Sequence, residues 1–154
     1  MTTPEETRTA GSDALRLNRQ VCFAMYSASR AATAVYRPML EELGLTYPQY
    51  LAMLVLWEAD PRSVRDLGEE LGLDSGTLSP LLKRLEALGF VERRRSAEDE
   101  RRVEIYLTDA GAALRAKAGG IPQRLADAAG LTAAELDQLR ETLGRLSEAL
   151  HAAR

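Results

Sequence analysis

The sequence contains a single cysteine and a single histidine in 154 residues. One cysteine excludes an internal disulfide, and the sequence has no CxxC pair or Cys/His cluster that would predict a metal site. His151 lies in a polar C-terminal tail, where we expect it to face solvent. The sequence therefore disfavours a metalloenzyme or a Cys/His catalytic pair, and we expect neither a metal nor a cofactor.

Long apolar runs are also missing, because no stretch approaches the roughly 18 residues that cross a membrane. The opening "MTTPEETRTAGSD" is polar and contains no signal-peptide core. We therefore expect residues 1–12 to form a flexible tail and the protein to be cytoplasmic, with no membrane association. The hydrophobic fraction of 45% is sufficient for one folded domain, or for one domain with long helices that a partner covers.

The overall charge has the wrong sign for a protein that coats nucleic acid, with a net charge of -3 and a pI of about 5.3. A local basic patch can still support binding. Residues 83–95, "KRLEALGFVERRR", carry five basic side chains and two acidic ones. The basic charge is thus concentrated where a predicted hairpin begins.

Helical spacing of apolar residues predicts a long helix from Asp13 to Tyr36. Pro38 is then expected to open a second short turn, "PMLEEL", which Gly44 ends. At the other end of the chain, a capping box from Thr132 to Glu135 begins a helix with a leucine stripe. The stripe consists of Leu136, Leu139, Leu143, Leu146 and Leu150.

The middle of the chain predicts a helix capped by Thr46, a helix that begins at Ser63, and a tight turn "GLDSGT" into a further helix. Next come "FVERRR" and "VEIYLT", which predict a β-hairpin. A helix capped by Thr108 follows, and "GGIP" is expected to interrupt it. This order indicates a winged helix-turn-helix. The fold class is therefore mainly α with a small β-hairpin wing, and the chain divides into N-terminal helices (13–46), the winged helix-turn-helix region (47–108) and C-terminal helices (109–154).

In such a fold the second helix of the motif enters the major groove. Its inner face would carry Leu78, Leu82 and Leu85. The predicted DNA contacts are Ser75, Thr77, Ser79, Lys83 and Arg84 on the outer face, with Arg94, Asp99 and Arg101 of the hairpin. The cations would mainly meet phosphates, and the hydroxyls are short enough to approach bases.

Pro80 conflicts with a helix that begins directly after Asp74, because proline inside a helix removes a hydrogen bond at a cost of up to about 3 kcal/mol. Either the helix begins near Thr77, or it bends at Pro80.

Two other interpretations of this region remain open. The helices could be ordinary core helices with a solvated charge run, or the winged helix could bind protein, which the acidic total favours. We favour DNA binding because the hydroxyl-rich turn and the basic hairpin occur in the expected order. The terminal helices could pack on one another within one chain, but we favour a homodimer because the small central unit cannot cover both.

The chain from about Leu15 onward resembles the MarR family of dimeric winged-helix repressors, through "LTDAG" and "EDERR" at the hairpin. The resemblance implies that Asp99 orients Arg101 for insertion into the minor groove. The segment "LNRQVCFAMYSASRAATAVYRPMLEELGLTYPQYLAMLVLWE" is similar to the organic hydroperoxide resistance regulators, OhrR. That similarity implies that Cys22 senses peroxide and that Tyr36 and Tyr47 donate hydrogen bonds to its sulfur.

The chemistry of a sensing cysteine fits this resemblance. A reactive sulfur must be partly thiolate, and phenols can donate to it inside an apolar wall without burying a charge. Tyr36 lies 14 residues beyond Cys22, about 21 Å along a straight helix, so it can only reach the cysteine of another subunit in antiparallel orientation. Tyr26, four residues on, is the neighbour within the chain.

The chain has no second cysteine, and Asp127 stands where a resolving cysteine might be sought. We therefore predict that Cys22 is oxidised to a sulfenate, which a small cellular thiol then caps or which is more slowly overoxidised. The apolar surroundings, Val21, Phe23 and Met25, favour organic hydroperoxides over hydrogen peroxide. The oxidised homodimer would leave a palindromic double-stranded operator. The alternatives are a repressor released by a small aromatic ligand, with Cys22 structural, and a thiol-dependent peroxide-consuming enzyme, which lacks a positioned base.

Overall fold

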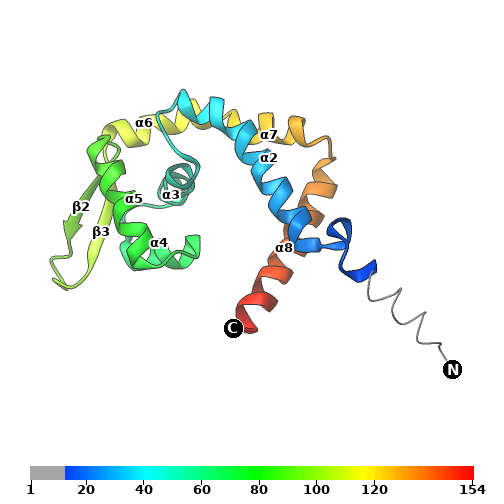
Figure 1. Cartoon of the computed structure of the whole chain (residues 1–154). Coiled ribbons are helices and arrows are strands. Elements are labelled where there is room, and N and C mark those ends of the chain that lie inside the picture. Colours follow the sequence, from blue (N-terminus) through cyan, green and yellow to red (C-terminus); the bar gives the residue numbers. More distant parts are fainter. Residues whose placement is uncertain (1–12) are drawn as a thin grey trace.

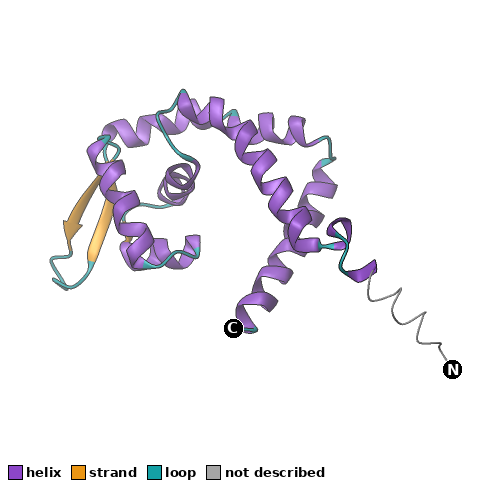
Figure 2. Cartoon of the chain, viewed as in Figure 1, coloured by secondary structure: helices purple, strands orange, loops and turns teal. Residues whose placement is uncertain are grey.

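The computed structural model describes residues 13–154, and the predicted tail at residues 1–12 lies outside them. Residues 13–154 are mostly helical, with one small antiparallel sheet (Figure 1, Figure 2). The elements are the 3-10 helix η1 (Leu17–Arg19), α2 (Val21–Glu41), α3 (Tyr47–Glu58), β1 (Arg62–Ser63), α4 (Val64–Leu71), α5 (Ser75–Ala87), β2 (Val91–Arg95), β3 (Val103–Leu107), α6 (Asp109–Ala118), α7 (Ile121–Ala129) and α8 (Ala133–Ala152). This confirms the predicted helical class with a hairpin wing.

The first long helix begins later than the apolar spacing predicts. The backbone of Gln20 is extended, with φ -88° and ψ 114°, and α2 begins only at Val21. The Gln20 side chain donates to the carbonyl oxygens of Ala14 and Arg16, at 2.8 and 2.9 Å, and holds the preceding turn closed. The prediction of one helix from Asp13 was therefore wrong, because a side-chain contact interrupts it.

The same helix also continues further than predicted. Pro38 does not open a new turn but lies inside α2, which runs on to Glu41. The next two residues, Met39 and Leu40, are buried against the core, and this packing keeps the last turn in place despite the missing N–H. Gly44, with φ +71°, then reverses the chain as expected.

The helix-turn-helix is built from α3, α4 and α5, whose first turns are capped by side chains. The capping box of Thr46 and Gln49 is present, and Ser63 accepts from the backbone N–H of Asp66. The helix α5 begins at Ser75, so the alternative of a start near Thr77 was wrong. Asp74 caps it, and Pro80 therefore lies in its interior.

The wing forms a sheet with strand order β1-β3-β2. The hairpin pairs Val91 with Leu107 and Arg95 with Val103. The sequence did not predict β1, whose two residues pair with Ile105 and Glu104 of β3. This short strand joins the wing to the start of α4.

The C-terminal part folds as three helices separated at glycines. Thr108 caps α6, α6 ends before the predicted interruption at "GGIP", and α7 follows. The capping box of Thr132 and Glu135 opens α8. Figure 1 shows an arch in which α6 and α7 connect the winged helix on one side to α2 and α8 on the other.

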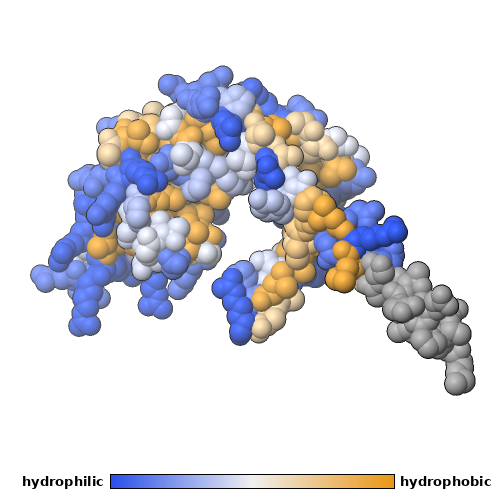
Figure 3. All heavy atoms as spheres, viewed as in Figure 1, coloured by the Kyte–Doolittle hydropathy of each residue, from blue (hydrophilic) through white to orange (hydrophobic). Residues whose placement is uncertain are grey.

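The buried core lies in the winged helix and at its junction with the end of α2. The arch's other side is different, because α8 has no buried residue and α2 buries only Met39 and Leu40. Apolar side chains gather on the surface of this side (Figure 3). Within residues 13–154, no helix combines the length and apolar character that a membrane crossing would require.

Candidate functional site

The predicted recognition helix α5 presents its polar face to solvent. Ser75, Thr77, Lys83 and Arg84 are exposed and Ser79 is half-buried. The opposite face is fixed in the core by Leu78, Leu81, Leu82 and Leu85, each at most 7% exposed. The helix start is held by Asp74, whose carboxylate accepts from the Thr77 backbone N–H at 2.7 Å. This hydrogen bond lowers the pKa of Asp74, so the cap stays charged.

Arg94 of the wing is not a free cation. Its guanidinium pairs with Glu92 at 2.9 Å and lies over the ring of Tyr106, 4.6 Å from the centroid. The hydrogen bond from Arg94 lowers the pKa of Glu92. The Tyr106 hydroxyl in turn donates to Glu104 at 2.9 Å. Arg94 is therefore held against the sheet.

The tip of the wing is closed by hydrogen bonds to side-chain oxygens. The Asp99 carboxylate accepts from the backbone N–H of Arg101 at 3.0 Å, and Ser96 accepts from the backbone N–H groups of Glu98 and Asp99. Asp99 thus holds the backbone at Arg101, whose side chain is exposed. The resemblance assigned Asp99 an orienting role toward Arg101, and the contact in the structure is to the backbone.

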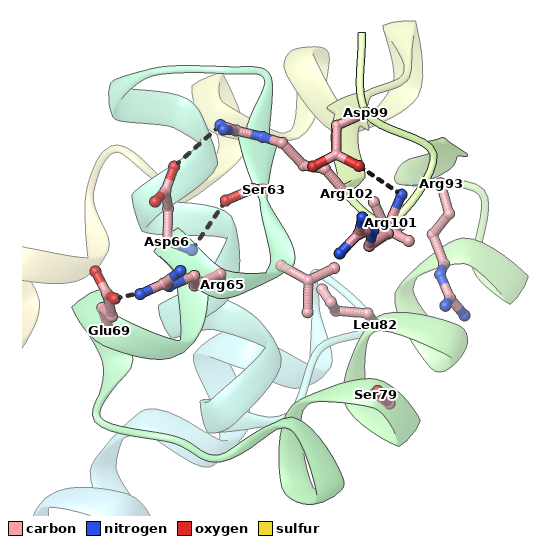
Figure 4. Close-up of a pocket in the computed structure, with 12 residues that line it drawn as sticks. Ser63, Arg65, Asp66, Glu69, Ser79, Leu82, Arg93, Asp99, Arg101 and Arg102 are labelled. Carbon is pink, nitrogen blue, oxygen red and sulfur yellow. Dashed lines mark hydrogen bonds and ion pairs between the residues drawn. The ribbon is translucent and has the colours of Figure 1, made fainter. Parts of the chain in front are cut away.

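Arg102 ties the wing to α4, a role that the sequence did not suggest. It pairs with Asp66 at 3.7 Å (Figure 4) and also with Glu104 at 3.6 Å. Asp66 is also the residue whose backbone Ser63 caps. Both residues lie in charged runs, where the sequence gives no sign of a partner far along the chain.

A cleft of about 660 Å³ opens between α4, α5 and the wing. Figure 4 shows arginine side chains of the wing and of α4 around it, with Ser79 on α5. The residues that line it include Ser79, Arg93, Asp99, Arg101 and Arg102. The structure therefore brings together predicted contacts from the helix and the hairpin and adds Arg93, which belongs to the basic run found in the sequence.

Cys22 lies in the first turn of α2 and is exposed in the single chain. No acidic residue shares that turn, and the N-terminal end of a helix favours a negative charge. Tyr26, one turn further along, is 60% exposed, and its ring is covered by the guanidinium of Arg30 at 5.5 Å. The sequence missed this placement because it extended the helix back to Asp13.

Tyr36 and Tyr47 meet at the other end of α2. Their ring centroids are 4.8 Å apart, and Tyr50 completes the cluster at 5.9 and 6.3 Å. Burial, with the neighbouring Tyr47 and Tyr50, raises the pKa of Tyr36 to about 12. Burial likewise raises the pKa of Tyr50. Tyr36 and Tyr50 therefore stay protonated and able to donate at neutral pH.

Cys22 and this phenol cluster do not meet within one chain. Both Cys22 and Tyr36 lie on the continuous helix α2, so 14 residues separate them by about 21 Å. Within residues 13–154, no hydrogen bond is made by the hydroxyl of Tyr36 or Tyr47. Asp127, where a resolving cysteine might be sought, lies on α7 and accepts from Gln123 at 2.8 Å.

Comparison with known proteins agrees with the fold. Residues 34–117 match the family model described as "Transcriptional regulator SarA/Rot". The chain is 48% identical over 139 residues to the organic hydroperoxide resistance transcriptional regulator of Bacillus subtilis, covering 90% of this chain and 95% of that protein.

Two solved proteins have the same fold. The reduced form of AbfR bound to DNA is 35% identical, with a TM-score of 0.76 over 91% of this chain and 98% of that one. AbfR is from Staphylococcus epidermidis and has also been solved overoxidised on DNA and in a disulfide form. The regulator PcaV of Streptomyces coelicolor, with its natural ligand, is 26% identical, with a TM-score of 0.81 over 89% of this chain and 98% of that one.

The helix-turn-helix, the wing and these likenesses define a winged-helix transcriptional regulator. The chain belongs to the MarR family of such regulators, in the organic hydroperoxide resistance (OhrR) subfamily.

Proposed function

We propose that the protein is a peroxide-responsive repressor that binds a palindromic operator as a homodimer and leaves it when an organic hydroperoxide oxidises Cys22. Oxidation yields a sulfenate, which a small cellular thiol converts to a mixed disulfide. Two features of α2 carry this proposal. Cys22 is exposed at its start, and the phenols of Tyr36 and Tyr47, whose hydroxyls make no hydrogen bond among residues 13–154, lie near its other end.

The exposed face of α5 supports DNA binding. Ser75 and Thr77 stand at the end of the helix that would enter the major groove, and Lys83 and Arg84 follow for phosphates. At the wing, Arg101 projects from a tip that Asp99 closes, whereas Arg94 is engaged by Glu92. We therefore assign minor-groove contact to Arg101 and a supporting role in the sheet to Arg94.

Exposed apolar surface supports the homodimer. Among residues 13–154, twelve large hydrophobic side chains are exposed, and nine of them lie before or on α2 or on α8: Leu15, Leu17, Val21, Phe23, Tyr26, Val35, Leu139, Leu143 and Leu150. A monomer would leave this surface in water, and a second copy would bury it. Both terminal helices therefore form the proposed interface.

The antiparallel arrangement of the two α2 helices brings the separated groups together. The phenols of one subunit then reach the partner's Cys22, to whose thiolate Tyr36 and Tyr47 donate hydrogen bonds. The raised pKa of Tyr36 supports a donor that keeps its proton. The start of α2 adds a favourable dipole to the same thiolate.

The redox steps are those of a single cysteine. The thiolate attacks the terminal peroxide oxygen, the O–O bond breaks, and an alcohol leaves once its alkoxide takes a proton. A small thiol then attacks the sulfenic sulfur, the S–O bond breaks, and water leaves. AbfR has been solved on DNA both reduced and overoxidised, so neither of these states prevents AbfR from binding DNA. This supports the bulkier mixed disulfide, rather than overoxidation, as the state that releases DNA here.

Release follows from geometry. A thiol adduct at the subunit junction separates packed helices. The winged helices of the two subunits then no longer match operator half-sites about 34 Å apart. The apolar residues Val21, Phe23 and Met25 around the sulfur favour organic hydroperoxides over hydrogen peroxide.

The test is operator binding by the purified protein before and after an organic hydroperoxide with a small thiol, beside Cys22→Ser. The wild type should lose DNA and regain it with reductant, whereas Cys22→Ser should stay bound throughout. Loss of DNA by Cys22→Ser on the same treatment would refute the proposal. Cumene hydroperoxide and hydrogen peroxide at equal dose compare the oxidants, and equal rates would remove the organic preference.

A second candidate is a repressor released by a small aromatic ligand. A cavity of about 250 Å³ lies between α3, α6 and α7, with Tyr50, Trp57 and Arg115 in its lining, and PcaV has been solved with its natural ligand. The aromatic walls suit an aromatic ligand, and Arg115 could meet the carboxylate of an aromatic acid, although Glu58 also belongs to the lining. Release of Cys22→Ser from DNA by such an acid, without oxidant, would favour this candidate.

A further inference from the structure

The face of α2 beside Cys22 carries an unusual charge pattern. Residues 14–40 contain four arginines and no acidic residue, although the whole chain has 23 acidic residues and a net charge of -3. Arg16 and Arg19 both pair with the single carboxylate of Asp13, at 3.5 and 3.4 Å. Arg30 and Arg37 take part in no ion pair among residues 13–154.

Both unpaired arginines line one groove of about 630 Å³ along α2. Its other residues are aromatic, hydroxyl-bearing or small: Phe23, Tyr26, Ser27, Ser29, Ala31, Thr33 and Ala34. Arg30 is fixed over the ring of Tyr26, whereas Arg37 has no such contact. The groove thus offers two cations and several hydroxyls, with no carboxylate to compete for them.

The proposed dimer places this groove next to the reacting sulfur. Cys22, Ser29 and Tyr36 recur every seven residues and share one stripe of α2. When Tyr36 meets the partner's Cys22, the two helices cross at Ser29, which also lines the groove. Arg37 then comes level with the residue that precedes the partner's Cys22.

We propose that this groove holds the thiol that caps the sulfenate, and that Arg37 with Arg30 selects a thiol bearing a carboxylate. The inference rests on the proposed function and names its co-reactant by class. The thiol's carboxylate meets the guanidinium groups while its sulfur attacks the oxidised Cys22. The S–O bond of the sulfenic acid breaks as the S–S bond forms, and the hydroxide leaves as water with the thiol's proton.

The polarity of the groove assigns it to the thiol rather than to the hydroperoxide. Of the three apolar residues that favour an organic hydroperoxide, only Phe23 lines the groove, whereas Val21 and Met25 do not. A small carboxylate-bearing thiol is polar over most of its surface and matches serine and threonine hydroxyls beside two arginines.

The experiment measures the rate of mixed-disulfide formation, by intact-protein mass spectrometry, on full-length protein first oxidised with cumene hydroperoxide. Three thiols of similar size are compared: 3-mercaptopropionate, 2-mercaptoethanol and cysteamine. Because intrinsic thiol reactivity differs, the quantity of interest is the ratio of the variant rate to the wild-type rate for each thiol. The variants are Arg37→Gln and Arg37→Lys, with Lys117→Gln on α6 as a control for loss of one exposed cation.

Arg37→Gln should slow capping by 3-mercaptopropionate about three- to fivefold, leave 2-mercaptoethanol unchanged, and not slow cysteamine. Arg37→Lys should restore part of the loss, Lys117→Gln should match the wild type, and added salt should reduce the difference. Equal ratios for all three thiols would overturn the inference while leaving the redox switch intact. Failure of cumene hydroperoxide to oxidise Cys22 at all would instead refute the proposed function.

Discussion

Replacing Tyr36 by Phe removes one hydroxyl and keeps the ring that packs at 4.8 Å from Tyr47. A hydrogen bond to a charged acceptor contributes about 1.5–3 kcal/mol. Because about 1.4 kcal/mol corresponds to a factor of ten, loss of this donor should weaken the stabilisation of the charged Cys22 sulfur by the equivalent of about tenfold or more. The rate of sulfenate formation should fall by a similar factor, while DNA binding by the reduced dimer remains.

The assay is the rate of loss of free thiol after addition of cumene hydroperoxide, followed by a sulfenate-trapping reagent. Tyr26→Phe is the matched control, since it removes a phenol hydroxyl one turn from Cys22 on the same chain, whose ring is covered by Arg30. It should react within about twofold of the wild-type rate. If Tyr36→Phe and Tyr47→Phe both react as fast as the control, the phenols are not the donors and the subunit-crossing site is wrong.

Three further predictions concern folding, assembly and pH. Gly111→Ala should destabilise the fold by about 3 kcal/mol or more in urea unfolding, because its new Cβ would lie 2.0 Å from the Phe90 carbonyl oxygen. Gly144→Ala is the control, since its Cβ would meet nothing within 4 Å and should cause no such loss. Equal losses of stability in the two variants would contradict the packing argument. Leu143→Asp should convert the dimer to a monomer in light scattering, and an unchanged mass would remove α8 from the interface. The pKa of Tyr36 is raised from 10.0 to about 12, so its contribution to the free energy of unfolding is complete below pH 10 and is lost as the pH rises toward 12. Tyr36→Phe should therefore lose less stability than the wild type over that range. Parallel curves of unfolding free energy against pH would refute the assignment.

Local capping signals predicted the fold well, because the contacts that start a helix lie within three or four residues. Thr46, Ser63, Thr108 and Thr132 each begin a helix where their spacing indicates. The interruption at Gln20 was missed, because its amide reaches carbonyl oxygens six and four residues back in a turn without a regular pattern. Apolar spacing alone therefore overestimated the length of the first helix.

Contacts between distant segments could not be predicted in this way. The strand β1 exists only because Arg62 and Ser63 pair with β3, about forty residues later. The ion pair of Arg102 with Asp66 is equally remote in sequence. Arg94 pairs with its neighbour Glu92, a contact that counting charges along the sequence could not predict. The sequence indicated that Cys22 and Tyr36 cannot meet in one chain, and the continuous helix α2 agrees with that expectation.

Trp57, the only tryptophan in the sequence, lies between the phenol cluster and α6. Its ring meets Tyr50 edge-on at 6.5 Å, and its indole N–H donates to the carbonyl oxygen of Gly111 at 2.9 Å. Any shift of α3 relative to α6 changes the polarity around this one indole. The protein consequently carries its own fluorescent reporter, and the emission wavelength of Trp57 can follow movement of α3 relative to α6 in real time without an attached dye.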